Sequence, residues 1–437
     1  MIREDLIWVG TPDFAGRLRG KAFPAAERQR RLRRGVGWTP TNIQITCFDL
    51  IAESPFGALG DLLLIPDPAA ESRVDYGDGS PPDHVMIGDI CELDGTPWDF
   101  CSRSRLKSAL ARLEKATGLS LLVAYEHEFH LKGAQRPKGD AYSLAGFRAQ
   151  AAFAETLMAA LRHGGLVPDT IMKEYAPDQY EVTVAPAPAL RAADEAALLR
   201  EITRSTAARL GDTASFTPLR QPGGVGNGVH IHMSLRDKAG KPATYDPAKP
   251  DCLSDVAGAF AAGILRYLEA IVALTAPAAI SYSRLVPHRW SAAYNNLGLR
   301  DREASLRICP TTAVEPQSIA AQFNLEYRAA DAAASPHLAL AAIVEAGVQG
   351  IEEGLSAPAA TEADLTTLSR EELDEAGLVR LPESLEEALD RLGANPTVTG
   401  WFPPGFVDLY RAHKQGELSF LEGMDPAAIC AAYEESY

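Results

Sequence analysis

Glu126 and Glu128 lie two residues apart in a β-like segment, residues 123–131. Side chains alternate between the two faces of a strand, so a strand here places both carboxylates on one face, roughly 7 Å apart. Two like charges held that close are unfavourable unless a cation lies between or beside them. The spacing therefore predicts a metal-binding strand, whose other ligands must come from elsewhere in the chain.

Three further segments combine acids or imidazoles with strand-like alternation. Residues 173–181 carry two glutamates, residues 229–235 carry two histidines and a serine on one face, and residues 324–328 carry a glutamate and an arginine on one face. Taken singly, such pairs are more often solvated edges or structural histidines than metal ligands. Taken together they form a set dominated by hard oxygen atoms, which favours Mg²⁺ or Mn²⁺ over zinc. The residues are Glu126, Glu128, Glu174, Glu181, His230, His232, Ser234 and Glu326.

Arginines recur on short segments beside these acids. Guanidinium groups bind carboxylate and phosphate through two parallel hydrogen bonds. Metal carboxylates together with arginines are what phosphoryl transfer requires, because both neutralise and align the transferred group. Surface salt bridges are the alternative, but they do not explain why the arginines recur beside acids and Gly/Pro turns. The arginines are Arg284, Arg300, Arg302, Arg307 and Arg328.

The elements that position these residues are of two kinds. Short β-like runs fill the first part of the chain, at residues 6–9, 43–46, 61–65 and 85–87. Helical periodicity begins after Cys101, and Gly118 ends the first helix. Later helices are predicted over residues 145–163, 190–210 and 256–274, after Ser335 as an N-cap, and after a capping box of Ser384 with Glu387. Strands carrying the polar residues lie between the helices, which indicates an α+β fold with a small N-terminal β domain and a large catalytic domain.

Composition excludes several classes of protein. The chain has 437 residues and a formal net charge of −16, which argues against a nucleic-acid partner. Its six cysteines form no CxxC pair, so we expect neither a zinc site nor a disulfide framework, and a reducing, cytoplasmic location. The apolar stretch 256–278 is interrupted by Arg266 and Glu269, so we expect a buried core helix and no membrane span. The acidic start predicts no signal peptide.

The order of the motifs resembles the glutamine synthetase family, in particular its glutamate–amine ligase (γ-glutamyl amide synthetase) branch. The resemblance covers nearly the whole chain. Its motifs are Glu126/Glu128, Glu174/Glu181, residues 226–234, residues 281–287, Arg302/Arg307 and Glu326/Arg328, preceded by residues 16–21 and 60–67. It implies an N-terminal β-grasp domain, residues 1–103, and a catalytic domain, residues 104–437, whose antiparallel strands line a metal funnel. It also implies ATP as co-substrate, two or more Mg²⁺ or Mn²⁺ ions, and a dodecamer of two hexameric rings with active sites between subunits.

The resemblance assigns a role to each matching residue. Glu128, Glu174 and Glu181 would bind the metal near the glutamate substrate, and Glu126, His230 and Glu326 would bind the metal that carries the ATP phosphates. His232 and Ser234 would lie near those phosphates, and Arg302 and Arg307 would contact the transferred phosphoryl group. Gly226, Arg284 and Arg328 would hold glutamate. These assignments imply that the reaction forms γ-glutamyl phosphate, from which an amine displaces phosphate.

The departures from the family concern the amine. Where ammonium-using members carry an aspartate near the N-terminus, this chain has Thr39, and where they carry a glutamate after the 284–287 motif, it has Trp290. Glu174 remains as a local acid, and the indole of Trp290 suits an alkyl or aromatic amine. His288 is a second candidate base, although an ordinary loop histidine is an equally good interpretation. Asn324 stands where ATP-using members often have arginine.

We therefore expect an ATP-dependent ligase that condenses glutamate with an organic amine, with Arg302, Glu174 and Trp290 acting in the reaction. Glutamine synthetase proper, which uses ammonium, is the alternative within the same class. A non-catalytic assembly protein of the same family and a ligase for another acid are further alternatives.

Overall fold

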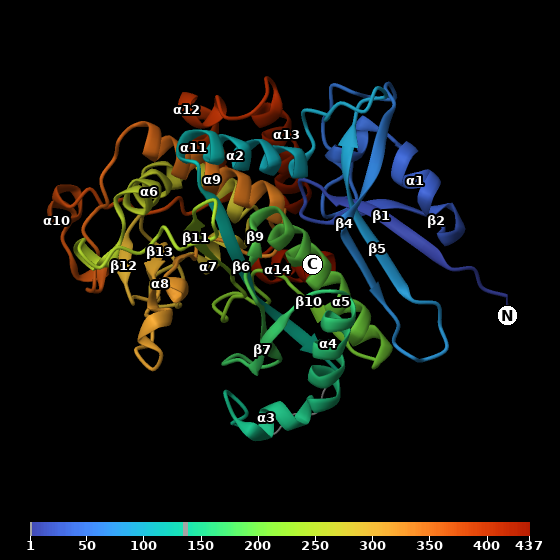
Figure 1. Cartoon of the computed structure of the whole chain (residues 1–437), viewed down its shortest axis with the longest axis horizontal. Helices are drawn as coiled ribbons and strands as arrows, with labels where there is room; N and C mark the ends of the chain where they lie inside the picture. Colours follow the sequence, from blue (N-terminus) through green and yellow to red (C-terminus); the bar gives the residue numbers. More distant parts are fainter. Residues whose placement is uncertain (1, 134–138) are drawn as a thin grey trace.

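Two β-sheets, separated in the sequence by helix α2 (Ser102–Thr117), organise the chain (Figure 1). The structure is a computed structural model that describes residues 2–133 and 139–437. The first sheet has the order β2-β1-β5-β4-β3, with β1 and β5 parallel and the other neighbours antiparallel. Its strands are β1 (Leu6–Pro12), β2 (Leu18–Pro24), β3 (Val36–Trp38), β4 (Leu62–Val74) and β5 (Asp83–Cys91).

The second sheet contains nine strands, and its main path runs β12-β13-β14-β11-β6-β8-β7. Strand β6 lies at its centre, and β9 and β10 also pair with it. Along β6 the odd-numbered residues, such as Val123 and Tyr125, are buried, so the even-numbered Glu126 and Glu128 point to the opposite face. The strands are β6 (Ser120–Lys132), β7 (Pro168–Lys173), β8 (Gln179–Val184), β9 (Ala187–Pro188), β10 (Thr213–Ser215), β11 (Val229–Arg236), β12 (Leu297–Leu299), β13 (Leu306–Ile308) and β14 (Leu325–Tyr327).

Helices pack on this sheet and on one another. Helix α5 contacts β6, and α9 packs between α2 and α6. By length and composition α6 could span a membrane, but 83% of its apolar window is buried in the protein, as expected of a core helix. The helices besides α2 are α1 (Arg28–Arg34), α3 (Leu144–Ala149), α4 (Ala151–His163), α5 (Ala189–Arg209), α6 (Asp255–Thr275), α7 (Ser281–Arg284), α8 (Ile319–Gln322), α9 (Pro336–Glu352), α10 (Arg370–Glu375), α11 (Leu385–Ala394), α12 (Pro396–Thr399), α13 (Phe406–Leu421) and α14 (Pro426–Ser436).

Three local predictions need correction. The run 43–46 is not a strand: a 3-10 turn, Pro40–Gln44, occupies its first half, because proline fixes φ and opens the turn. The helix predicted over 145–163 is broken at Gln150, whose φ is −129°. The capping box of Ser384 is half formed: its hydroxyl accepts from the Glu387 amide, but the Glu387 carboxylate accepts from the Glu383 amide. Ser335 precedes α9 as predicted, but its side chain makes no cap hydrogen bond.

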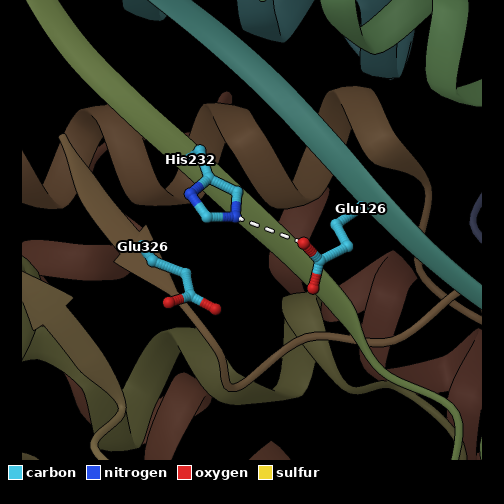
Figure 2. A group of neighbouring side chains, drawn as sticks. All are labelled: Glu126, His232 and Glu326. Atoms are coloured by element: carbon cyan, nitrogen blue, oxygen red, sulfur yellow. Dashed lines mark ion pairs between the residues drawn. The ribbon is translucent and has the colours of Figure 1, made fainter. Parts of the chain in front are cut away.

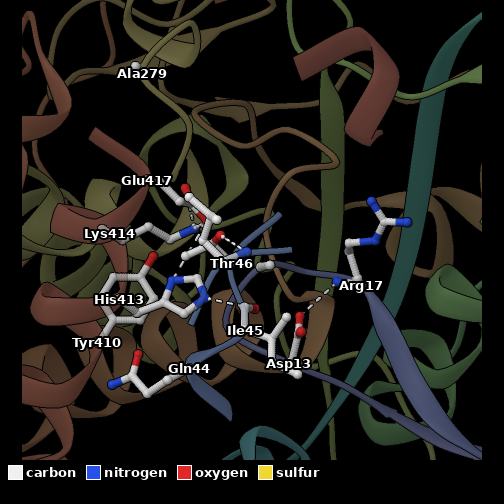
Figure 3. Close-up of polar contacts among 12 residues, drawn as sticks. Asp13, Arg17, Gln44, Ile45, Thr46, Ala279, Tyr410, His413, Lys414 and Glu417 are labelled. Atoms are coloured by element: carbon white, nitrogen blue, oxygen red, sulfur yellow. Dashed lines mark hydrogen bonds and ion pairs between the residues drawn. The ribbon is translucent and has the colours of Figure 1, made fainter. Parts of the chain in front are cut away.

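Buried polar contacts join the segment 44–46 to helix α13 (Figure 3). The Gln44 amide donates to the Leu409 carbonyl at 2.9 Å, and a ring nitrogen of His413 lies 3.3 Å from the Ile45 carbonyl. Lys414 and Glu417 form an ion pair at 3.0 Å with both side chains fully buried. The contacts of Gln44 and Ile45 therefore hold the N-terminal segment against helix α13, in which the Lys414–Glu417 pair is internal.

Candidate active site

The registers of four neighbouring strands bring the predicted acids together. Glu126 on β6 lies opposite His230 on β11, and Glu128 on β6 lies opposite Glu181 on β8. On the next strand, Glu326 of β14 lies opposite His232 of β11. Directly paired residues of antiparallel strands have Cβ atoms about 4.5–5.5 Å apart on one face. Residues far apart in sequence therefore form one polar surface.

The first acidic group consists of Glu128, Glu174 and Glu181, whose carboxylate oxygens lie within 4.8 Å of one another. Glu174 comes from the loop after β7, and it is oriented by two donors. The Tyr142 hydroxyl donates to its Oε2 at 2.8 Å, and the Tyr175 amide donates to the same atom at 2.9 Å. The three acids predicted for one metal therefore do lie together.

Burial and mutual repulsion dominate the electrostatics of Glu128 and Glu181. Burial raises the pKa of Glu128 to about 7, although the Gly228 amide donates to its carboxylate at 2.6 Å. Burial, followed by the charges of Glu126 and Glu128, raises the pKa of Glu181. A divalent cation bound by these carboxylates would remove the mutual repulsion, so the group fits Mg²⁺ or Mn²⁺.

The second group consists of Glu126, His232 and Glu326, again with ligand atoms within 4.8 Å of one another. The His232 ring lies between the two carboxylates, with Nε2 3.7 Å from Glu126 Oε2 (Figure 2). His230, which we predicted in this group, also lies beside it: its Nδ1 is 2.7 Å from Glu126 Oε1 and 3.6 Å from Glu326 Oε1. Both histidines are thus placed to join the two carboxylates around a cation.

The carboxylates of the second group are held ionised. Burial alone would raise the pKa of Glu126, but hydrogen bonds to His230 and His232 lower it. Burial opposes ionisation of Glu326 as well, but the charge of Arg328 and the neighbouring cations lower its pKa to about 2. An ionised carboxylate is ready to bind metal without releasing a proton, unlike Glu128.

Of the predicted arginines, two meet at Glu326. Arg307 on β13 donates to its Oε2 at 2.8 Å, and Arg328 donates to its Oε1. Arg300 is exposed and pairs with Glu362 at 3.3 Å. Arg302 is also exposed and makes no hydrogen bond or ion pair with any described residue. The structure therefore brings Arg307 and Arg328 to the acids but not Arg302, whose catalytic role stays a prediction.

Arg284 and two glycines form a pocket suited to an anion. Arg284 is buried, one of its terminal nitrogens donates to the Arg328 carbonyl at 3.4 Å, and Nη1 has no partner among the described residues. A Cβ at Gly226 would lie 2.6 Å from the Arg284 side chain, and one at Gly228 would lie 2.5 Å from its Nη2. Only glycine permits this approach, which leaves a buried guanidinium open for a carboxylate.

A cavity of about 420 Å³ adjoins the first acidic group, and aromatic side chains form its outer wall. Trp290 and Tyr175 are each 65% exposed and Tyr142 is 52% exposed, so large apolar surfaces face the opening. Glu128, Glu174 and Arg284 line its inner part. A second cavity, of about 330 Å³, adjoins the second acidic group. Its lining includes Glu126, His232, Ser234 and Asn324.

Hydrogen bonds from side chains to the backbone fix the loop that carries Trp290. Both His288 and Trp290 have left-handed backbones, with φ of 60° and 52°. The Glu303 carboxylate accepts from both of their amides at 3.0 Å, and Arg328 donates to the Trp290 carbonyl at 3.0 Å. The conformation is unfavourable for residues with a side chain, so these bonds must hold it.

Three residues of the site were missed from the sequence. Tyr142 and Glu303 act on neighbours that only the folded loops bring close, and no local pattern identifies them. Cys309 lies on the edge of the second group, with Sγ 3.4 Å from Glu326 Oε2. It follows β13 by one residue, and the strand register that places it was not evident from spacing.

Comparisons with known proteins agree with this geometry. Residues 3–98 match the glutamine synthetase N-terminal domain, and residues 99–426 match the glutamine synthetase catalytic domain. The chain is 31% identical to the gamma-glutamylpolyamine synthetase of Streptomyces coelicolor over 97% of this chain and 92% of that protein. It is 29% identical to the glutamine synthetase of Thermococcus kodakarensis, again over 97% and 92%. A crystal structure described as a novel glutamine synthase homolog has 42% identity and a TM-score of 0.92, covering 100% of this chain and 99% of that chain.

Proposed function

Because the chain belongs to the glutamine synthetase family, we propose that this ATP-dependent ligase joins glutamate to an organic amine through γ-glutamyl phosphate. The family and its α+β fold, both predicted from the motifs, are confirmed by the matches to its two domains and by the similar crystal structure. Family members use glutamate, ATP and an amine or ammonia. The choice between an organic amine and ammonia is our proposal.

The carboxylate groups suit the activation half of the reaction. We infer that Glu128, Glu174 and Glu181 would hold one divalent cation and that Glu126 and Glu326, with His230 or His232, would hold another. Such cations neutralise phosphate charge and align the transferred group. Arg307 adds a guanidinium beside the second group, and the open Nη1 of Arg284 suits a carboxylate of glutamate. Activation is needed because an amine does not displace oxide from a carboxylate anion.

The amine half of the proposal depends on Trp290. Its exposed indole stands at the cavity mouth, and Tyr142 and Tyr175 line the same cavity. Indole and phenol faces attract a cation and also shelter its carbon chain from water. In the second half-reaction the amine loses a proton, and Glu174, oriented by Tyr142 and Tyr175, is the carboxylate placed to accept it. A small ammonium ion would leave the aromatic wall without a partner.

Two observations bear on the choice between an organic amine and ammonium. The relative from Streptomyces coelicolor is named for a polyamine substrate, which agrees with an organic amine here. The acids Glu128 and Glu174 line the same cavity, and they would also attract ammonium, so glutamine synthetase proper is the second candidate. We further propose a cytoplasmic dodecamer of two hexameric rings. In this assembly Thr39, exposed on the N-terminal domain, would face a neighbouring subunit's amine entrance.

ATP-dependent phosphate release distinguishes these candidates. The full-length enzyme is assayed with glutamate, ATP and Mg²⁺ against ammonium, alkylamines, diamines, polyamines and aromatic amines, and the product is identified by mass spectrometry. We expect the kcat/KM of the best organic amine to exceed that of ammonium by at least about tenfold, as a hydrophobic pocket discriminates substrates. A higher kcat/KM for ammonium would identify glutamine synthetase proper. No phosphate release with any amine would overturn the proposal and leave a non-catalytic protein or a ligase for another acid.

A further inference from the structure

His232 presents its two ring nitrogens to two different sets of partners. Its Nε2 faces Glu126 in the second acidic group, at 3.7 Å from Oε2. On the opposite side of the ring, Nδ1 lies 2.9 Å from Asn324 Oδ1 and 3.7 Å from Cys309 Sγ. Figure 2 shows the ring between Glu126 and Glu326, so the second nitrogen faces away from Glu126. The Nδ1 side therefore has donors that the Mg²⁺ ligand set does not use.

The distances on the Nδ1 side match those between ligands of one metal ion. Cys309 Sγ lies 3.7 Å from His232 Nδ1 and 3.4 Å from Glu326 Oε2. With Zn–S near 2.3 Å and Zn–N or Zn–O near 2.0–2.2 Å, a tetrahedral zinc ion separates such ligand pairs by roughly 3.5 Å. Asn324 Oδ1 adds a neutral oxygen on the same side of the ring.

The Nδ1–H of His232 points to Asn324 Oδ1, an oxygen that only accepts, so a cation at this position would displace that proton and bind Nδ1 and Oδ1 in its place. The Cys309 thiol donates its proton to Glu326, so a cation at this position would replace a proton that the two side chains already share. The Glu326 oxygen that accepts from Arg307 has a second lone pair. Cys309 itself is buried, but His232 and Asn324 line the 330 Å³ cavity, which provides a route for the ion.

We propose that Cys309, His232, Glu326 and Asn324 form a binding site for a thiophilic divalent metal ion of the Zn²⁺ class, beside the carboxylates used for Mg²⁺. Soft thiolate and imidazole ligands favour Zn²⁺, whereas Mg²⁺ prefers oxygen ligands. Binding releases two protons to solvent, one from the Cys309 thiol and one from His232 Nδ1, with no change of oxidation state. Cysteine spacing gives no sign of the site because the other donors come from other strands.

The site has a consequence for catalysis that rests on the proposed function. Zn²⁺ bound to Glu326 and His232 would occupy two residues of the second acidic group, so it would inhibit the ligase. Inhibition would fall when nucleotide-bound Mg²⁺ reached the group first. The metal binding itself does not depend on which amine the enzyme uses.

Co²⁺ is a direct probe of the proposed site because it adopts the same tetrahedral coordination as Zn²⁺. Its thiolate complexes absorb in the near ultraviolet. We expect Co²⁺ titrated into the full-length, metal-free protein to give a thiolate charge-transfer band and the intense visible bands of tetrahedral cobalt, and Zn²⁺ to abolish both. A weak octahedral spectrum without a thiolate band would overturn the proposal. This measurement needs neither a variant nor enzymatic activity.

Variants assign the band to its cysteine. Cys309→Ser should remove the thiolate band and raise the Zn²⁺ concentration for half-inhibition at least about tenfold, each variant being compared with its own uninhibited rate. Cys252→Ser is the matched control, since Cys252 is half-buried in a 3-10 turn away from the acids, and it should keep the wild-type band. A band that survives Cys309→Ser would place the metal elsewhere and overturn the assignment.

The readouts separate the two proposals. A thiolate band without any ligase activity would support the metal site and contradict the proposed function. Ligase activity without the thiolate band would support the proposed function and contradict the metal site. Should Cys309→Ser fail to fold, wild-type protein labelled with a thiol reagent in the presence and absence of Zn²⁺ tests the same contact. Mass spectrometry should then show Cys309 protected by Zn²⁺, and equal labelling would contradict the proposal.

Discussion

The metal surface and the amine entrance are built in different ways. The acids of the metal surface stand on paired strands, where backbone register sets their separation: Glu126 opposite His230, and Glu128 opposite Glu181. The amine entrance stands on loops, where Trp290 and His288 have left-handed backbones held by the Glu303 carboxylate. In the function that we propose, the sheet would give the activation chemistry a rigid frame, and the loops would leave the choice of amine to a few side chains.

This comparison predicts that a change on the metal surface affects the whole reaction. Glu326 accepts from Arg307 and Arg328 and is only 1% exposed, so Glu326→Gln leaves two buried guanidinium groups without a counter-charge. We expect the kcat/KM to fall by at least about a thousandfold for every amine, and the free energy of unfolding to fall by about 3–5 kcal/mol. Steady-state assays and urea denaturation measure both effects.

The control is Glu362→Gln, which removes an exposed acid paired with Arg300. It should change the free energy of unfolding by less than about 1 kcal/mol. A Glu326→Gln enzyme that kept near-normal turnover with any amine would mean that this carboxylate does not serve the activation step.

A change at the entrance should instead affect one substrate. Trp290→Ala removes an exposed indole from the cavity mouth without touching the acids. We expect the KM for an organic amine to rise about ten- to a hundredfold, the loss of one apolar and cation–π contact, while the KM for ATP and glutamate stays nearly unchanged. Leu93→Ala, which truncates another apolar side chain that is 65% exposed, is the control. Equal increases of all three KM values would contradict the division between the two regions.

The sequence predicted the arrangement of the metal surface better than that of the amine entrance. Period-two spacing predicted that Glu126 and Glu128 share a face, because strand geometry needs only local sequence. It did not predict that Glu303 would hold Trp290, because that contact depends on the loop conformation. The error at residues 43–46 has a related cause: tertiary contacts of Gln44 with helix α13 outweigh a strand-like run. The contact of Arg302 with the transferred phosphoryl group was implied by the family resemblance, and the isolated chain leaves that residue exposed.

Metal affinity should depend on pH in one group more than in the other. Burial raises the pKa of Glu128 to about 7, so below that pH its carboxyl is protonated and must release a proton when a metal binds. Because burial and the neighbouring acids also raise the pKa of Glu181, to about 10, we expect the affinity of the metal-free protein for Mn²⁺ to rise steeply with pH up to 7 and by about tenfold per pH unit from pH 7 to 8.5. Calorimetric titration between pH 5.5 and 8.5, in buffers of different ionisation enthalpy, measures the affinity and the number of protons released.

A Glu128→Gln variant sharpens this expectation, because it should bind Mn²⁺ more weakly and lose the change of slope near pH 7, while Glu181 keeps a pH dependence. The ionised carboxylates Glu126 and Glu326 should still bind a cation with little dependence on pH in this range, since their pKa values are lowered. An affinity for both ions that stayed constant from pH 5.5 to 8.5 would contradict the assignment of Glu128 to a metal.

The smallest expected effect comes from a substitution that acts only on the loop carrying Trp290. Glu303→Gln keeps the length of the side chain, but its amide offers one oxygen where the carboxylate offered two, so one of the amides of His288 and Trp290 loses its acceptor. A charge-assisted bond of this kind contributes about 1.5–3 kcal/mol, part of which water recovers at this half-exposed position. We therefore expect the KM for the organic amine to rise about three- to tenfold, with little change in the KM for glutamate.

Glu303→Asp should recover part of the loss, since it keeps both acceptor oxygens on a shorter side chain, and Glu303→Ala should exceed Glu303→Gln. A purely structural role would lower the free energy of unfolding and the kcat for every substrate in parallel, without this order. If the three variants differ only in stability, the entrance is held chiefly by other contacts, such as those of Arg328 and Arg289 with the Trp290 and Gly223 carbonyls. Because Arg328 also bonds Glu326, the metal surface would then set the position of the amine loop.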